Sequence, residues 1–440
     1  MVESMEAGSD IQKELASNYR HNFLVNALDG ASYWFGYSFI APTIILPLYV
    51  SHFTNNPLII GLIPFINTAG VLLPQLFTSN FVEQAPRKKF FPVNLGFFLE
   101  RMPVFLLAPS AFFLALNHPN LALIAFFVLF TWYCAGAGLI IVGWQDMIAK
   151  IFPVDKRGRF FGITNFIGNT SGILGALAVT FVLGRFTFPQ GFVFAFTAAA
   201  ILILISWIAL SQTREPAVAS QKPAVSQLDY LRTLPAIVQK DRNFLRYLLA
   251  QIVYALSGMA SGFLIVYAVK TWHLPDAAAG GFVLAMQIGQ SATNLFLGFL
   301  ADRKGHKVSL EISLLMSAVS LALALIAPSP VWFYPVFFFR GAVVAGTLIS
   351  GVSIVYEFTT EENRPTYIGL ANTIPGVAGT VAPLFGGWLA GAAGYPWMFG
   401  LSTAIGVASL ALLHFTVREP RILGKAALEL EVEPGGDPTE

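Results

Sequence analysis

Charged side chains that interrupt long apolar runs are the residues of this sequence most capable of chemistry. Asp29, Glu100, Arg101 and Arg340 each lie inside such a run. An ionisable side chain within a membrane is costly, so each position is a candidate functional site. Asp29 could take up and release a cation such as a proton, or it could be a helix cap or a water-exposed group. Arg340 could hold an anion or act as a switch, or it could belong to a static buried ion pair.

The adjacency of Glu100 and Arg101 limits how these two residues can interact. Neighbours on an α-helix point about 100° apart and do not face each other. We therefore expect each side chain to find a different partner on a neighbouring helix. Both are expected to brace the structure rather than to act on a ligand.

The sequence shows no catalytic apparatus. It contains no cluster with metal-ligand spacing, no Ser-His-Asp arrangement and no phosphate-binding loop. Its single cysteine, Cys134, lies in an apolar run and is expected to be a buried thiol. We therefore expect a protein that is not an enzyme and that holds neither a metal nor a cofactor.

The elements that must position these charges are membrane helices. Of the 440 residues, 55% are hydrophobic and 11% are charged, whereas a soluble domain carries about 25% charged residues. The lipid bilayer is therefore expected to replace water around most of the chain. The formal net charge of +2 gives no reason to expect nucleic acid as a partner.

Twelve segments are long and apolar enough to cross roughly 30 Å of hydrocarbon, which takes about 20 residues of helix. They lie near residues 23–50, 57–80, 90–114, 121–147, 159–183, 190–211, 244–270, 277–300, 308–328, 331–356, 366–390 and 395–416. Most of the 26 basic residues fall in loops on the side of the N-terminus. Because cytoplasmic loops retain Lys and Arg, we expect a multi-pass protein of the cell membrane with both termini in the cytoplasm.

Short sequence matches recur in the same order in the two halves of the chain. Asn22-Phe23-Leu24 recurs as Asn243-Phe244-Leu245, Arg157 to Asn165 recurs as Arg364 to Asn372, and Arg214-Glu215-Pro216 recurs as Arg418-Glu419-Pro420. These matches indicate a duplicated six-helix unit. We expect an N-terminal bundle at 1–212, a cytoplasmic linker at 213–242, a C-terminal bundle at 243–418 and a cytoplasmic tail at 419–440. A surface helix from Ser226 and a disordered tether remain alternatives for the linker.

The loop after the eighth span carries charged residues at a fixed spacing. It reads Gly298-Phe-Leu-Ala-Asp302-Arg303-Lys-Gly305-His-Lys307. Gly298 is expected to allow close helix contact and Gly305 a tight turn. Asp302 is expected to accept backbone N–H groups at a helix N-terminus, and Arg303 to form an ion pair.

This loop, together with the twelve spans, resembles the G-x-x-x-D-R-x-G-x-K signature of the major facilitator superfamily. A degenerate copy in the first half keeps Glu83 and Lys88 but has Gln84 and Pro86 where the signature has arginine and glycine. The resemblance implies two pseudo-symmetric six-helix bundles that work by alternating access about a midplane site. It also places Asp29 on a cavity-lining helix and makes the proton the candidate coupling ion.

The resemblance further implies acids that lock an inner gate, Asp146 and Glu357. We expect Glu357 to form a latch with Arg303. Asp146 is expected to pair with a base of its own half, which is Arg87, Lys88 or Arg157.

Two further patterns match the superfamily only in part. The arginine that many members carry four residues before Gly136 is Trp132 here, which argues against proton antiport. The glycines at positions 168, 172 and 175, with the 383–387 segment, resemble a weakened exporter motif. Close helix packing through small residues is the alternative.

The side chains expected to line the cavity mix aromatic rings with a few amides. They are Trp34, Trp132, Tyr133, Gln251, Tyr254, Gln287 and Asn294. Such walls suit a small amphipathic or polar organic molecule. We expect a monomeric secondary transporter, with export of a drug-like or metabolite molecule favoured over uptake of a sugar or organic anion. A non-transporting receptor or a lipid-handling protein is the alternative from another class.

Overall fold

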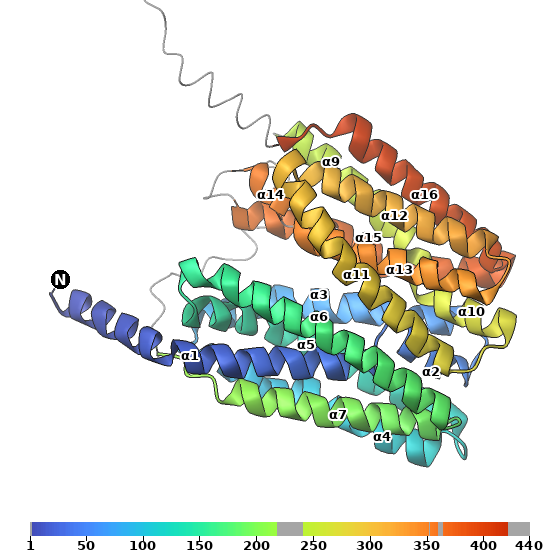
Figure 1. Cartoon of the computed structure of the whole chain (residues 1–440), viewed down its shortest axis with the longest axis horizontal. Helices are drawn as coiled ribbons and strands as arrows, with labels where there is room; N and C mark the ends of the chain where they lie inside the picture. Colours follow the sequence, from blue (N-terminus) through green and yellow to red (C-terminus); the bar gives the residue numbers. More distant parts are fainter. Residues whose placement is uncertain (1, 218–240, 352, 360–363, 421–440) are drawn as a thin grey trace, which may run out of the picture. The chain divides into compact units, whose positions relative to one another are not determined.

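The chain is helical throughout the part that a computed structural model describes, residues 2–217, 241–351, 353–359 and 364–420 (Figure 1). The helices up to residue 217 are α1 (Val2–Ser38), α2 (Ile45–Ser51), α3 (Pro57–Gln84), η1 (Phe90–Leu95), η2 (Phe97–Arg101), α4 (Met102–Leu114), α5 (Pro119–Ile151), α6 (Val154–Arg185) and α7 (Gln190–Ser211). From residue 241 they are α9 (Arg242–Ser257), η3 (Gly258–Phe263), α10 (Leu264–Trp272), α11 (Ala277–Lys304), α12 (His306–Ile326), η4 (Pro330–Trp332), α13 (Phe333–Ser350), α14 (Ser353–Glu357), α15 (Arg364–Ala393) and α16 (Tyr395–Thr416).

Eleven helical runs of the described residues are long and apolar enough to cross a membrane. They correspond to the second to twelfth predicted spans, and the predicted all-α membrane fold is confirmed. The first predicted span, 23–50, is not one helix, because α1 ends at Ser38 and α2 begins only at Ile45. Pro42 lies in this break, where its missing N–H would have removed a helical hydrogen bond. The predicted helix at Ser226 lies outside the described residues, as do most of the linker and the tail.

Residue contacts divide the chain into two compact units. The first comprises Met1–Ala224 and Gly262–Gln287, and the second comprises Val225–Ser261 and Ile288–Glu440. The seventh span thus changes unit within the 3-10 segment η3. The predicted bundle and linker boundaries remain predictions.

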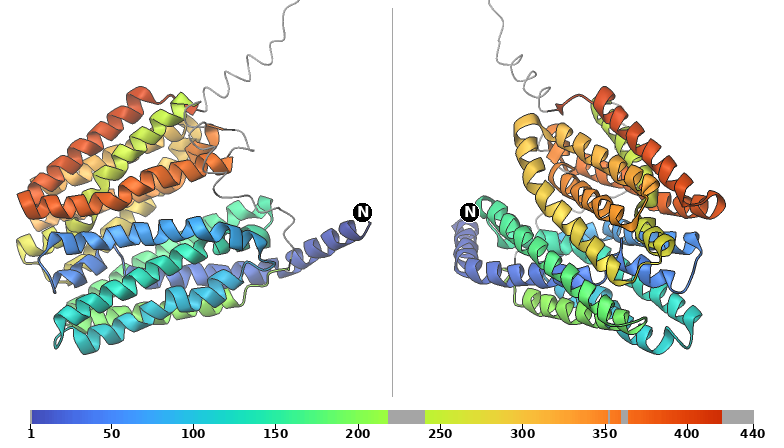
Figure 2. Two further views of the ribbon diagram at one scale, coloured as in Figure 1. Left: turned by 180° about the vertical axis from the view of Figure 1, so that it is seen from behind. Right: turned by 45° about the vertical axis from the view of Figure 1, so that its right-hand side comes forward.

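The first unit is held together by packing of α1 against α6 and α7, and of α3 against α5 (Figures 1 and 2). Residues 262–287 are fastened to this unit at several points. Asp276 lies 3.0 Å from the His52 imidazole, and the Lys270 amine donates to the backbone carbonyl of Thr54 at 3.3 Å. The ring of His52 also stacks on Phe188. A short segment of the seventh and eighth spans is therefore a structural part of the first unit.

The second unit repeats the packing scheme of the first. α9 packs against α15 and α16, as α1 packs against α6 and α7. α12 packs against α13 and α16, as α4 packs against α5 and α7. This recurrence agrees with the duplication that the sequence matches predicted.

The repeated sequence segments meet in space within each unit and form equivalent bonds. In the first, the Asn22 amide donates to the Arg214 carbonyl at 2.9 Å and accepts from the Arg214 N–H at 2.9 Å. In the second, Asn243 makes the same two bonds with Arg418, at 3.0 and 2.8 Å. We call each of these pairs an asparagine clasp. Each clasp ties the first helix of a half to the end of its sixth helix.

The acid that follows each clasp lies at the start of a helix. The Glu215 carboxylate, which is buried, accepts from the backbone N–H groups of Lys88 at 2.9 Å and Lys89 at 2.7 Å. It also forms an ion pair with Lys150 at 2.8 Å. These contacts form what we call the Glu215 clamp. Burial lowers the pKa of the Lys89 amine, against the opposing attraction of Glu215.

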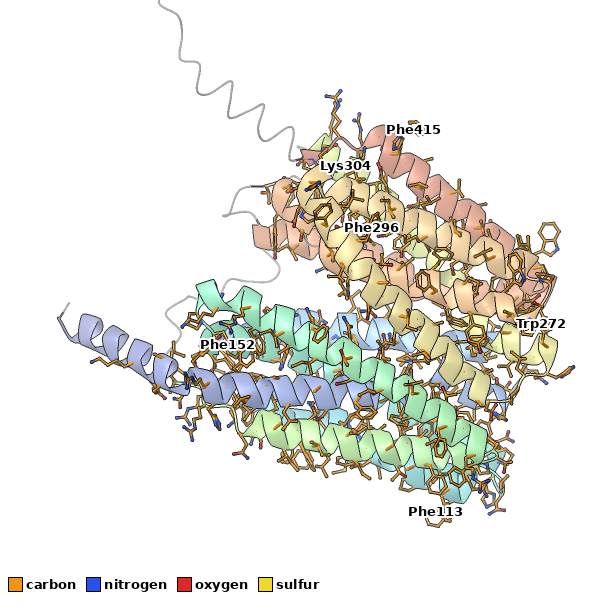
Figure 3. All side chains as sticks on the ribbon, in the orientation of Figure 1. Phe113, Phe152, Trp272, Phe296, Lys304 and Phe415 are labelled. Atoms are coloured by element: carbon orange, nitrogen blue, oxygen red, sulfur yellow. The ribbon has the colours of Figure 1, made fainter. Side chains whose placement is uncertain are left out.

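Large apolar side chains cover the outer faces of the helices, as lipid contact requires. Phe113 on α4 and Phe415 on α16 project away from the ribbons in Figure 3, and their exposed fractions are 66% and 81%. A soluble surface would not carry many such side chains.

Candidate coupling and substrate sites

Asp29 is a buried acid in the interior of α1. It is 7% exposed, and the hydroxyl of Ser206 on α7 donates to its Oδ1 at 2.6 Å. The helix continues for several residues on both sides, so Asp29 is neither a helix cap nor a water-exposed group. The two alternatives that the sequence left for Asp29 are therefore excluded.

Glu100 and Arg101 lie beside Asp29, and the prediction that they avoid each other is wrong. The Arg101 guanidinium forms an ion pair with the Glu100 carboxylate, and both side chains are buried. The cause is local, because residues 97–101 form a π-helix, whose wider turn changes the directions of neighbouring side chains. The charges of both residues act on Asp29.

Two tyrosines complete this group of polar side chains. The Tyr33 hydroxyl donates to Glu100 Oε1 at 3.0 Å and lies 3.2 Å from the hydroxyl of Tyr133 on α5. We call the whole group the Asp29 cluster. It consists of Asp29, Tyr33, Glu100, Arg101, Tyr133 and Ser206. Four helical elements of the first unit, α1, η2, α5 and α7, thus contribute side chains around one buried acid.

Arg340 lies within α13 in the second unit, in different surroundings. Its Nη2 donates to the Ser261 hydroxyl at 2.8 Å and its Nη1 to the Ser317 hydroxyl at 3.3 Å. The phenol of Tyr254 is close enough to act on it electrostatically. In the described part of the chain, no Asp or Glu forms an ion pair with Arg340. The alternative of a static ion pair is therefore excluded for these residues.

The other predicted cavity residues are dispersed. Trp34 is exposed and packs edge-on to Tyr33, and Gln251 donates to the Tyr247 hydroxyl at 2.9 Å. Gln287 lies against Gly172 of α6, and Asn294 is half-buried on α11. Trp132 lines an apolar groove of about 690 Å³ between α3 and α5.

The glycines of the fifth span face α1 closely. A Cβ atom at Gly168 would lie 2.7 Å from the Trp34 ring, and one at Gly175 would lie 2.7 Å from the Ser38 side chain. This is the geometry of close helix packing, so these glycines no longer favour export over uptake.

The loop signature behaves as predicted at one glycine and not at the other. Gly305 has a φ of +94° and caps α12, as expected for a tight turn, and a Cβ there would meet the carboxylate of Glu419. Nothing lies within 4 Å of a Cβ added at Gly298, so the predicted close helix contact is wrong for the described residues. Gly298 instead lies on an open face of α11.

Among the charged residues predicted to form the gate, the structure contains one of the expected ion pairs. Asp146 lies 3.4 Å from the Lys88 amine, one of its three expected partners. Arg303 places its guanidinium over the Phe299 ring at 4.1 Å, and Asp302 is exposed beside it. The Glu357–Arg303 latch remains a prediction, and the side chain of Glu83 lies outside the described residues. Lys307 pairs with Glu311 at 3.3 Å.

Comparison with known proteins then bears on the family. A family model described as Major Facilitator Superfamily matches residues 247–434. The chain is similar to this superfamily over its second half. The resemblance predicted from the loop signature is confirmed.

Superfamily members with known names match parts of this chain. It is 31% identical over 122 residues to the niacin transporter NiaP of Acinetobacter baylyi, covering 28% of each protein. It is 24% identical over 193 residues to the efflux pump apf11 of Gibberella fujikuroi, covering 43% of this chain and 33% of that protein. The matches thus span at most a third of these curated relatives.

Solved structures of the superfamily share the fold. The nucleoside transporter NupG superposes with a TM-score of 0.67 at 13% identity, covering 90% of this chain and 99% of that one. A D-xylose-proton symporter superposes with a TM-score of 0.61 at 16% identity, covering 92% and 99%.

Several members of the two sites carry no signal in the sequence. Tyr33, Ser206, Ser261 and Ser317 are ordinary residues of apolar helices, and nothing in their spacing marks them. Each of these residues can be recognised as a site member only when the neighbouring helices are known. Glu100 and Arg101 were visible as membrane charges but were assigned to bracing, and the structure places them beside Asp29.

Proposed function

We propose that this protein is a secondary active transporter that moves a small organic solute across the cell membrane by alternating access, with both termini in the cytoplasm. Similarity to the major facilitator superfamily and the duplicated helical units support this proposal. The observation that carries it is the Asp29 cluster, because a buried acid among membrane helices is costly without a function.

We further propose Asp29 as the group that couples transport to protons. Glu100 already has Arg101 as its counterion, whereas Asp29 forms no ion pair with a described residue and holds one hydroxyl. Its charge is therefore free to change on protonation without breaking an ion pair. A change of charge at the packing contact between α1 and α7 is a physical means of biasing two conformations.

The direction of transport is open to experiment. The named relatives include a niacin transporter and an efflux pump. The glycines that favoured export serve helix packing, so neither direction has an advantage from the structure.

The test uses the purified full chain in proteoliposomes with a fluorescent pH indicator inside. Sugars, amino acids, carboxylates and cationic drugs are added in turn under an imposed proton gradient, and solute and proton fluxes are measured together. Asp29→Asn should abolish gradient-driven accumulation but preserve exchange of internal for external solute. Glu14→Gln, a change at an exposed acid of α1, should leave both intact.

Gradient-driven accumulation that survives in Asp29→Asn would show that Asp29 is not the coupling group. Binding of a solute without any flux in the parent protein would instead favour a receptor or a lipid-handling protein.

A further inference from the structure

Arg340 is a positively charged side chain inside an apolar membrane helix. It lies in the interior of α13, among apolar residues and distant from both ends of the span. A cation placed there is stable only if a negative charge or a strong set of acceptors compensates for the lost water. The surroundings of Arg340 therefore decide whether the compensation is built into the protein.

Among the residues that the structure describes, Arg340 forms hydrogen bonds to neutral oxygens only. Ser261 and Ser317 each accept one hydrogen bond, whereas a guanidinium has five N–H donors. The described acids of the second unit are engaged or placed elsewhere. Asp241 caps α9, Glu311 pairs with Lys307 and His414, Glu419 lies at Gly305, and Asp302 and Glu357 lie near the ends of α11 and α14.

Arg101 in the first unit provides an internal contrast. It is also an arginine within a membrane span, but Glu100 next to it neutralises its charge, and the side chain is 3% exposed. Arg340 is half-buried, so part of it is accessible. Arg101 is thus paired within the first unit. Arg340 has no counterion among the described residues and is not fully enclosed.

The backbone beside Arg340 is also irregular. Ser261 lies in η3, the 3-10 segment where α9 gives way to α10. Irregular backbone at membrane depth occurs where a helix is buried in protein or lines a cavity. Tyr254, on α9 before η3, lies close enough for its phenol to act electrostatically on the guanidinium.

We propose that Arg340, with Ser261 and Ser317, binds the carboxylate of a small organic monoanion, which is the solute that the protein carries. This inference rests on the proposed transport function and names its substrate class. The planar guanidinium matches a carboxylate with two parallel hydrogen bonds. Arg340 is one positive charge among neutral hydroxyls, so a monoanion is neutralised, whereas a dianion would leave excess charge. The Tyr254 ring suits an apolar or aromatic body behind the carboxylate.

The test measures binding to the full chain in detergent, where transport is not needed. Benzoate and nicotinate are compared with benzamide and nicotinamide, which have nearly the same shape but no charge. Both acids at millimolar concentration should raise the melting temperature and bind saturably, whereas the amides should not. Arg340→Gln should weaken binding of the acids at least about tenfold, since it removes a charged bidentate contact. Arg185→Gln, at an exposed arginine at the end of α6, should bind like the parent.

The stability of the unliganded variants separates a binding role from a structural one. If Arg340 is a binding residue whose charge is compensated only by a bound anion, Arg340→Gln removes an uncompensated charge. The melting temperature of the unliganded variant should then be no lower than that of the parent. Ser261→Ala provides a milder change that should weaken binding severalfold without loss of folding.

The proposal is overturned if the amides bind as well as the acids, if none of the acids binds, or if Arg340→Gln binds the acids normally. These results leave the transport proposal intact, since fluxes of other solutes test that separately. Binding of the acids that depends on Arg340, without flux of any solute, would support the anion site and contradict the transport proposal.

Discussion

The Glu215 clamp allows a quantitative test of how the first half is held together. Glu215→Ala removes a buried carboxylate that accepts two backbone N–H groups and pairs with Lys150. A hydrogen bond to a charged group contributes about 1.5–3 kcal/mol, so the two N–H bonds together contribute about 3–6 kcal/mol. Lys150 keeps its bond to the Pro86 carbonyl and is partly exposed, so its loss adds little.

We therefore expect Glu215→Ala to lower the free energy of unfolding by about 3–6 kcal/mol and Glu215→Gln by about half as much. The measurement is a denaturant titration of the detergent-purified protein followed by tryptophan fluorescence. Glu14→Gln, which changes an exposed acid, should stay within about 0.5 kcal/mol of the parent. A loss below about 1 kcal/mol for Glu215→Ala would refute the reasoning, since the clamp would then contribute no more than one ordinary hydrogen bond.

Two further predictions use the same titration. Asn22→Ala and Asn243→Ala each break a two-bond clasp and should each cost about 1–3 kcal/mol; a loss in only one of them would contradict the structural equivalence of the clasps. Gly305→Ala should destabilise by about 1 kcal/mol or more because of its positive φ, whereas Gly298→Ala, at an open helical position, should be neutral or stabilise by about 0.5–1 kcal/mol. Effects of the same sign at both glycines would contradict these assignments.

The sequence predicted the spans well because each depends on local composition. Long apolar runs, the repeats and the loop signature identified the superfamily before any helix was placed. The errors came from events inside a span. The turn containing Pro42 divides the first predicted span. The seventh is confirmed as one apolar run, Arg242–Trp272, although a 3-10 segment at 258–263 interrupts its α-helix. Hydropathy averages over such breaks.

The candidate sites were predictable only in part, because polar partners in a membrane protein come from different helices. Asp29 and Arg340 were visible as isolated charges. Their partners Ser206 and Ser261 have no sequence signal, since a serine in a membrane helix usually bonds its own backbone. The Glu100–Arg101 pair was missed because its π-helical turn does not follow from composition.

The asparagine clasps also bear on how such a chain can be divided. Each clasp joins the first helix of one half to the end of the sixth helix of the same half. No residue of the other half takes part in these bonds. A six-helix half that fastens its own two ends does not need the covalent connection at residues 218–240 to close on itself. We therefore expect the protein to reassemble when its two halves are translated as separate chains.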